Sequence, residues 1–181
     1  MQIGLVISYY GCMSSLHLAD GSSVRLRPLE PDDGPLLIRL FYRLSAESVY
    51  RRFMSPIPDP YRPQLRRLLD VDHRDREALA AISREGEVIG VARYARDAAD
   101  AERADIAVVV EDRWQRRGLG RALTRRLAAV ARRRGIAAFH ADLLSENRGA
   151  IRLLRGLSAA TRFRSSAGAM EADVPLHPTA H

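Results

Sequence analysis

The residues with the clearest chemical potential form a glycine-containing turn between an apolar run and a helical pattern. Residues 114–123 read WQRRGLGRAL and come shortly after the apolar run at 106–110. At the start of a helix, unpaired backbone N–H groups and aligned peptide dipoles together favour an anion. Gly118 and Gly120 would let the main chain approach that anion closely. Three arginines add positive charge at the rim: Arg116, Arg117 and Arg121. We therefore expect a phosphate or pyrophosphate here.

Two common phosphate-binding motifs do not fit this turn. A dinucleotide-binding fingerprint needs a third glycine and an acidic ribose ligand, and the sequence has neither at a suitable place. A P-loop needs a Gly-Lys pair, and the chain contains no lysine at all. What remains is the pattern Gln115-x-x-Gly118-x-Gly120.

The segments that must position this turn alternate between strand and helix patterns. Because strands outnumber the helices that could cross between them, we expect an α+β fold with a mixed, mainly antiparallel sheet of about six to seven strands flanked by helices. Strand patterns occupy 24–29, 78–82, 88–94, 105–110, 137–144, 161–164 and 169–174, and helix patterns occupy 31–44, 45–53, 63–69, 118–134 and 147–157.

The order strand, glycine turn, amphipathic helix resembles the Q/R-x-x-G-x-G/A region of the GNAT N-acetyltransferase superfamily. The resemblance covers roughly 24–176, and 24–33 (VRLRPLEPDD) and 43–53 (RLSAESVYRRF) are similar to the start of the acetyltransferase domain of bacterial protein lysine acetyltransferases. It implies acetyl-CoA as cosubstrate, with its pyrophosphate on the glycine turn. It also implies that the strands before and after the turn's helix splay apart.

The resemblance implies a set of cofactor contacts. The backbone of Val108, Val109 and Val110 would bind the acetyl-pantetheine arm and stabilise charge on the thioester oxygen, while their side chains lie in the core. Asn147 is similar to the family's cofactor-contacting asparagine, and its alternative is a first-turn residue behind a helix cap at Ser145. The turn itself contributes Gln115, Arg116, Arg117, Gly118, Leu119, Gly120 and Arg121.

Asp105 is the expected catalytic base. An amine with a pKa near about 10.4 is almost wholly protonated at neutral pH, so a base must take a proton before the amine attacks. The resemblance implies a glutamate here, and since aspartate is shorter it would act through a water. Asp105 shares a strand face with Ala107 and Val109, apolar neighbours that strengthen a carboxylate as a base. The alternatives are a solvated strand end or an arginine partner, with Glu102 and Glu111 as reserve candidates.

Three positions depart from the family pattern or invite another interpretation. Leu154 stands where many members carry a tyrosine that protonates the leaving thiolate, so the thiolate leaves unaided or Ser145 substitutes. Leu157-Ser158-Ala159 replaces the usual Gly-Phe, so the adenine end of the cofactor or the last strand would be packed differently. We expect His140 to be a core or edge residue rather than a base.

Composition restricts the partners. The formal net charge is +7, and all 29 basic residues are arginine, which suits phosphate and carboxylate partners. Aromatic residues make up 6% and do not interleave with the arginines, so nucleic acid is not favoured. Cys12 alone cannot form an internal disulfide, and no clustered ligands indicate a metal. No run reaches membrane-spanning length, and the single cysteine fits a reducing cytoplasm, so we expect a cytoplasmic protein. The use of arginine without lysine indicates a bacterium with a GC-rich genome.

The expected organisation is a flexible leader over 1–20, one N-acetyltransferase domain over 21–176 and a tail over 177–181. We expect transfer of an acetyl group to a primary amine, on a protein lysine or a small molecule. The alternatives are a catalytically degenerate fold that binds CoA as a sensor or structural subunit, and an arginine-rich nucleic-acid-binding protein. The sequence leaves open whether the chain forms a homodimer.

Overall fold

The centre of the structure, a computed structural model that describes residues 14–54, 69–166 and 168–176, is an eight-stranded sheet. The strand order is β1-β2-β3-β4-β5-β6-β8-β7, and every neighbouring pair is antiparallel except β5 and β6. The strands are β1 (Ser14–His17), β2 (Ser23–Pro28), β3 (Arg76–Ile82), β4 (Val88–Arg96), β5 (Arg103–Val110), β6 (Ala138–Leu144), β7 (Arg162–Ser166) and β8 (Ala169–Pro175).

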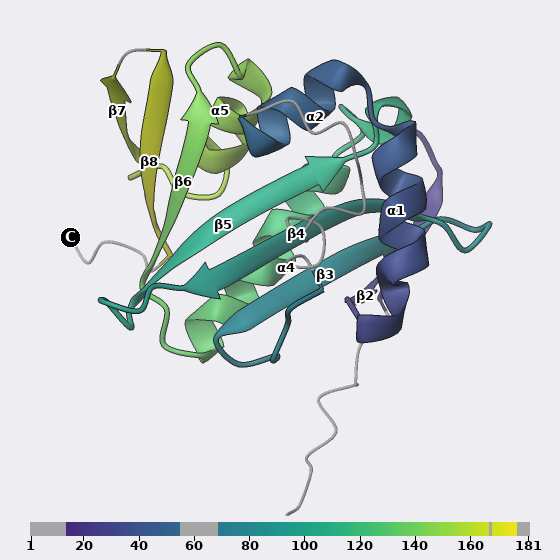
Figure 1. Cartoon of the computed structure of the whole chain (residues 1–181), viewed down its shortest axis with the longest axis horizontal. Coiled ribbons are helices and arrows are strands. Elements are labelled where there is room, and N and C mark those ends of the chain that lie inside the picture. Colours follow the sequence, from purple (N-terminus) through teal and green to yellow (C-terminus); the bar gives the residue numbers. More distant parts are fainter. Residues whose placement is uncertain (1–13, 55–68, 167, 177–181) are drawn as a thin grey trace, which may run out of the picture.

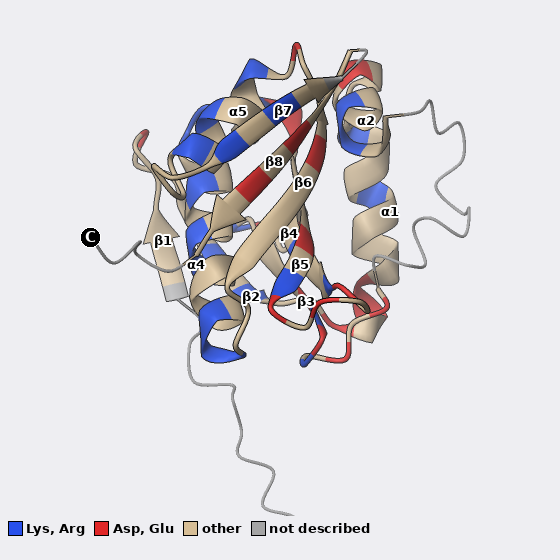
Figure 2. Cartoon of the chain, turned by 90° about the vertical axis from the view of Figure 1, so that its left-hand side faces the viewer, with Lys and Arg blue, Asp and Glu red and all other residues tan. Residues whose placement is uncertain are grey.

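The helices lie on both faces of this sheet. Figure 2 shows the sheet between α1 and α2 on one side and α4 and α5 on the other. The helices are α1 (Gly34–Arg43), α2 (Ala46–Phe53), α4 (Leu119–Arg133) and α5 (Arg148–Arg155), with single 3-10 turns at η1 (Pro31–Asp33) and η2 (Asp112–Trp114). The mixed, mainly antiparallel sheet flanked by helices is therefore confirmed.

Most differences from the expected elements lie near the N-terminus. β1 adds a strand beyond the expected number, because it pairs with β2 from within the segment expected to be a flexible leader. The sheet therefore includes Ser14–His17, which we had assigned to that leader. Residues 1–13 of the expected leader lie outside the described residues. The helix expected over 63–69 also lies outside them, apart from Leu69.

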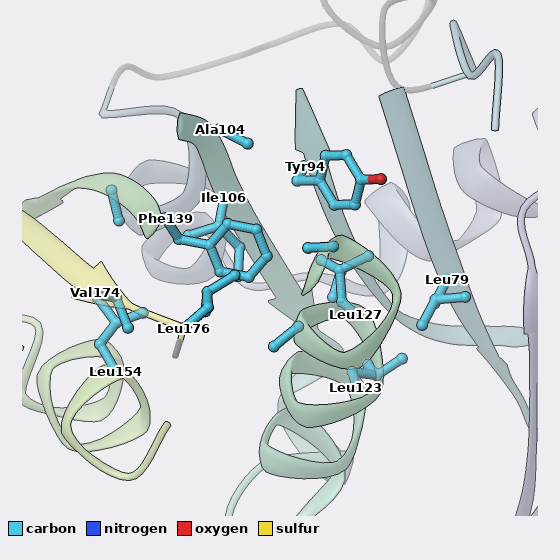
Figure 3. Close-up of a cluster of buried hydrophobic side chains, with 14 of the residues drawn as sticks. Leu79, Tyr94, Ala104, Ile106, Leu123, Leu127, Phe139, Leu154, Val174 and Leu176 are labelled. Carbon is cyan, nitrogen blue, oxygen red and sulfur yellow. The ribbon is translucent and has the colours of Figure 1, made fainter. Parts of the chain in front are cut away.

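The larger hydrophobic core lies between α4 and the sheet. Leu123, Leu127 and Ala131 of the expected helical stripe have no exposed side-chain surface, and Val130 is half-buried. Figure 3 shows the two leucines of α4 directed at side chains from the sheet. A smaller core under α1 contains Leu29, Leu37, Leu40, Ile82, Val88 and Val91.

β5 and β6 separate after a short parallel contact. Their pairing joins Arg103, Ala104 and Asp105 to Ala138, Phe139 and His140. β5 continues along β4 to Val110, whereas β6 continues along β8 to Leu144, and Figure 1 shows the two strands diverging. The splay that the family resemblance implied is thus present.

In the part of the chain that the structure describes, no helix has both the length and the apolar character needed to cross a membrane.

Candidate active site

The separation of β5 and β6 opens a cleft of about 730 Å³. Four parts of the chain line it: β5, the glycine turn with the start of α4, β6 with α5, and the inner side of α2. The expected site residues among its lining are Asp105, Val108, Val109, Val110, Gln115, Arg116, Gly118, Gly120, Arg121 and Asn147. Most residues expected from the sequence to form the site are therefore brought together.

Gly118 places the first turn of α4 at the cleft. It is the N-cap of α4 and has φ of +90°, a left-handed conformation in which any residue with a side chain would be strained. Gly120 differs, because a Cβ there would lie 3.8 Å from Leu153 and Val110, an ordinary contact distance. The conformation of the turn thus depends on Gly118, while Gly120 leaves room for a methyl group.

The arginines of the turn take different directions. Arg116 and Arg121 are exposed and line the cleft. Arg117 instead pairs with Asp20 at 2.6 Å, and its guanidinium lies over the Trp114 ring, 5.1 Å from the centroid. The Leu119 side chain is buried in the main core. Arg117 and Leu119 therefore do not line the cleft.

Gln115 connects the glycine turn to α2. Its Nε2 donates to the Val110 carbonyl oxygen at 3.0 Å and to Ser48 Oγ at 3.1 Å. Ser48 Oγ in turn donates to Asp112 Oδ1 at 2.8 Å. Asp112 also accepts from the backbone N–H of Ser45 at 2.9 Å and from its hydroxyl at 2.7 Å. The side chain of Gln115 is thus used to hold β5 and α2 together.

Hydrogen bonding lowers the pKa of Asp112. Burial alone would raise the pKa of this carboxyl, but hydrogen bonds from Ser45 and Ser48 outweigh burial and lower the pKa below its usual 3.8. The folded state therefore favours the carboxylate, which is the form that accepts all three bonds.

The three valines divide between the two faces of the sheet. Val108 and Val110 pack against the core under α4, and Val109 packs against the core under α1. All three are half-buried and line the cleft. They lie beyond the last residue of β5 that pairs with β6, so their backbone runs along the open edge of the cleft.

Asp105 lies at the point where β5 and β6 separate. It is exposed and lines the cleft, so the solvated strand end that we held as the alternative describes it better than an apolar setting. Its parallel neighbour on β6 is His140. The reserve candidates are elsewhere: Glu102 is exposed outside the cleft lining, and Glu111 is buried in a pair with Arg43 at 2.9 Å.

His140 is the functional candidate that sequence reasoning set aside. It lines the cleft beside Asp105, with Nδ1 3.3 Å from Asp173 and Nε2 3.5 Å from Asp142. Burial would raise the pKa of Asp173, but hydrogen bonding to His140 and the guanidinium of Arg103 outweigh burial and lower it. The sequence places His140 on the strand that follows the helix after the glycine turn. This position indicates a role in the site only once that strand is known to lie parallel to β5.

The α5 side of the cleft corrects one expectation and clarifies another. Asn147 is itself the N-cap of α5, because its Oδ1 accepts from the Ala150 N–H at 3.1 Å, so the cap is not Ser145. Ser145 bonds to the Ala169 carbonyl and does not line the cleft, which removes support for it as a proton donor. Leu154 is buried in the main core.

Among the described residues, no cluster of histidine, cysteine, aspartate or glutamate side chains could hold a metal ion.

Replacement of Asp112 by alanine tests the link between α2 and the glycine turn. The change removes the acceptor of three hydrogen bonds, so we expect the free energy of unfolding to fall by about 1 kcal/mol at neutral pH, since the site is partly exposed. Because folding lowers the pKa of Asp112, the advantage of the wild type is complete above pH 3.8 and is lost as the pH falls through the lowered pKa.

Urea unfolding followed by circular dichroism at several pH values measures this difference. Asp32→Ala, which removes an exposed carboxylate on η1, is the matched control and should leave the free energy of unfolding nearly unchanged. An advantage of the wild type over Asp112→Ala that does not depend on pH would contradict the assignment.

Comparisons with known proteins agree with this geometry. The model of the acetyltransferase (GNAT) family matches residues 44–158. The chain is 33% identical to the acetyltransferase Pat of Mycolicibacterium smegmatis over 84% of its own length, but it spans 46% of that relative. It is 32% identical to an acetyltransferase of Pseudomonas aeruginosa, covering 81% of this chain and 77% of the relative.

A solved structure gives the same result. The GNAT domain of S. lividans PAT matches with a TM-score of 0.81 and 33% identity, over 90% of this chain and 96% of that one. The residues matched by the family model include the glycine turn and both diverging strands. The chain belongs to the GNAT family of acetyltransferases.

Proposed function

We propose that the protein is an acetyl-CoA-dependent N-acetyltransferase that transfers an acetyl group to a primary amine by direct attack on the thioester. One observation carries the proposal. The N-terminus of α4, with Gly118 in the left-handed conformation, opens into the cleft between β5 and β6, and Asp105 lies where these strands meet. A pyrophosphate site and a carboxylate base thus share one cleft.

The residues of the turn and of β5 would hold the cosubstrate, which supplies the activated acetyl group when it is bound. The free N–H groups at the start of α4 suit the pyrophosphate, and Arg116 and Arg121 add positive charge from the cleft lining. The backbone of Val108 to Val110 would hold the pantetheine arm and place N–H groups near the thioester oxygen. Asn147 uses Oδ1 for its cap, which leaves its amide nitrogen for a ligand.

Asp105 would take the proton from the acceptor amine. Its exposure in the cleft allows a water between carboxylate and amine, which the short side chain requires. His140, held between Asp142 and Asp173 beside Asp105, can pass the proton on toward solvent. With Leu154 in the core, the departing thiolate has no acid at that position and leaves as the anion.

We propose a protein lysine as the acceptor, on the strength of the similarity of α2 and its surroundings to protein lysine acetyltransferases. The acceptor must come from outside the chain's own side chains, because the sequence has no lysine. Leu154, which lines the cleft but cannot donate a proton, favours one competing function, a degenerate fold that binds CoA without turnover.

Ligand-dependent thermal stability and thiol release distinguish these functions. We expect acetyl-CoA and CoA each to raise the melting temperature, because both would bind the folded state alone. We expect free thiol to appear with at least one member of a panel of small amines and lysine peptides. Stabilisation without turnover on the whole panel would favour the degenerate fold, and no stabilisation by either ligand would exclude both functions.

Substitutions at the two glycines test the pyrophosphate site. Gly118→Ala strains the left-handed N-cap and displaces the N–H groups, so we expect the acetyl-CoA affinity to fall by about tenfold or more. Gly120→Ala, whose methyl group fits at 3.8 Å from its neighbours, is the control and should keep the affinity within about threefold. Isothermal titration measures both, and equal losses would count against the assignment of Gly118.

Replacement of the carboxylate tests the base. We expect Asp105→Ala to lower kcat by about 10²-fold or more while the thermal shift with acetyl-CoA is kept, since Asp105 acts on the amine and not on the cofactor. Glu102→Gln, a nearby carboxylate outside the cleft lining, should keep wild-type kcat. Turnover unaffected by Asp105→Ala would mean that another group, with His140 the next candidate, takes the proton.

A further inference from the structure

Arg52 occupies an unusual position for a charged residue. It lies in the last turn of α2 and lines both the large cleft and a small adjoining pocket. All other lining residues of that pocket except Arg93 are apolar: Leu37, Leu40, Phe41, Leu44, Phe53, Val91, Ala107 and Val109. The guanidinium thus stands at an apolar wall, where a charge is costly without a partner.

No carboxylate neutralises Arg52 within the described ranges 14–54, 69–166 and 168–176. The Phe53 ring lies beside it, with the ring centroid 4.8 Å from the guanidinium carbon. The adjacent Arg51 shows the usual arrangement, because it pairs with Glu47 one turn earlier on the same helix. Arg43, on α1, pairs with both Glu87 and Glu111. Arg52 therefore differs from the arginines around it.

The local electrostatics favour an anion beside Arg52. Burial and, second, the positive charge of Arg93 lower the pKa of Arg52 to about 10. Burial also lowers the pKa of Arg93, with Asp70 acting in the opposite direction. An anion that approached Arg52 from the cleft would relieve the repulsion between the two guanidinium groups and gain a charge-assisted hydrogen bond.

The position of Arg52 relates it to the proposed reaction. Arg93 of β4 pairs with Ala107 of β5, and Ala107 lies two residues from Asp105 on the same strand face. α2 packs against β5 and β6. The acceptor end of the cleft thus has the carboxylate of Asp105 on the sheet and the guanidinium of Arg52 on the helix, which together suit a ligand with an amine and an anionic group.

We propose that Arg52 binds a carboxylate of the acceptor. The preferred acceptors then carry a carboxylate close to the amine that is acetylated. This assignment rests on the proposed function. This chemistry can come from two sources. One is a free amino acid, and the other is an acidic residue beside a target lysine. In both, the carboxylate would contact Arg52 while the amine faces Asp105.

Paired acceptors test this specificity. Free amino acids are compared with their amides, and lysine peptides with a neighbouring glutamate are compared with the same peptides carrying glutamine. For the wild type we expect the carboxylate member of the responding pair to have a KM lower by about tenfold or more. In Arg52→Gln this preference should disappear, because the KM for the carboxylate member rises to that of its partner. The kcat and the thermal shift with acetyl-CoA should remain at their wild-type values. Arg52→Lys should restore part of it.

A control variant separates a specific effect of Arg52 from the general effect of losing an arginine. Arg125→Gln removes an exposed arginine from the opposite side of the sheet and should keep the wild-type preference. The assignment is overturned if the wild type shows no preference in either set of pairs, if Arg52→Gln raises KM equally for both members, or if Arg125→Gln abolishes the preference as well. The responding set identifies the source of the carboxylate.

A binding measurement keeps this outcome distinct from failure of the proposed function. Calorimetric titration of an N-acetyl amino acid, and separately of its amide, into protein saturated with CoA needs no turnover. We expect the N-acetyl amino acid to bind the wild type about tenfold more tightly than its amide, and Arg52→Gln to remove the difference. Equal affinities in the wild type would overturn the assignment even if amines are acetylated.

Discussion

The separation of β5 from β6 is the constraint on which the site depends. Two strands that share a sheet normally satisfy each other's backbone groups along their whole length. Here β5 and β6 pair only over a short stretch, and beyond it β5 remains paired with β4 alone and β6 with β8 alone. The inner edge of β5 is thereby left beside a cleft within a continuous sheet, and the helix that follows β5 begins at the mouth of that cleft.

Basic and acidic residues gather on different elements of the protein. Figure 2 shows arginines along α4 and α5 and acidic residues on β6 and β8. Several arginines are used inside the fold, as in the pair of Arg134 with Glu77 at 2.7 Å and of Arg96 with Asp75 at 2.8 Å. The count of 29 arginines therefore overstates the positive surface that is free to meet a nucleic acid.

Local patterns predicted the elements, whereas pairing between distant segments determined the details of the site. The helical stripe of α4 follows from neighbouring residues, so the sequence was sufficient for it, whereas the left-handed conformation that distinguishes Gly118 from Gly120 was not predicted. The nearness of His140 to Asp105 depends on which strands are parallel, and the setting of Arg52 depends on how α2 lies against β5. Arg117 was predicted at the rim, yet it pairs with Asp20, almost a hundred residues away in the chain.

The contact of Gln115 with Ser48 has a mechanical consequence. Ser48 lies four positions before Arg52 on α2, and residues at this spacing share one face of a helix. The Gln115 side chain therefore connects the glycine turn directly to the helix that carries Arg52. Two walls of the cleft, the glycine turn and α2, are thus joined by a side-chain hydrogen bond as well as by the backbone.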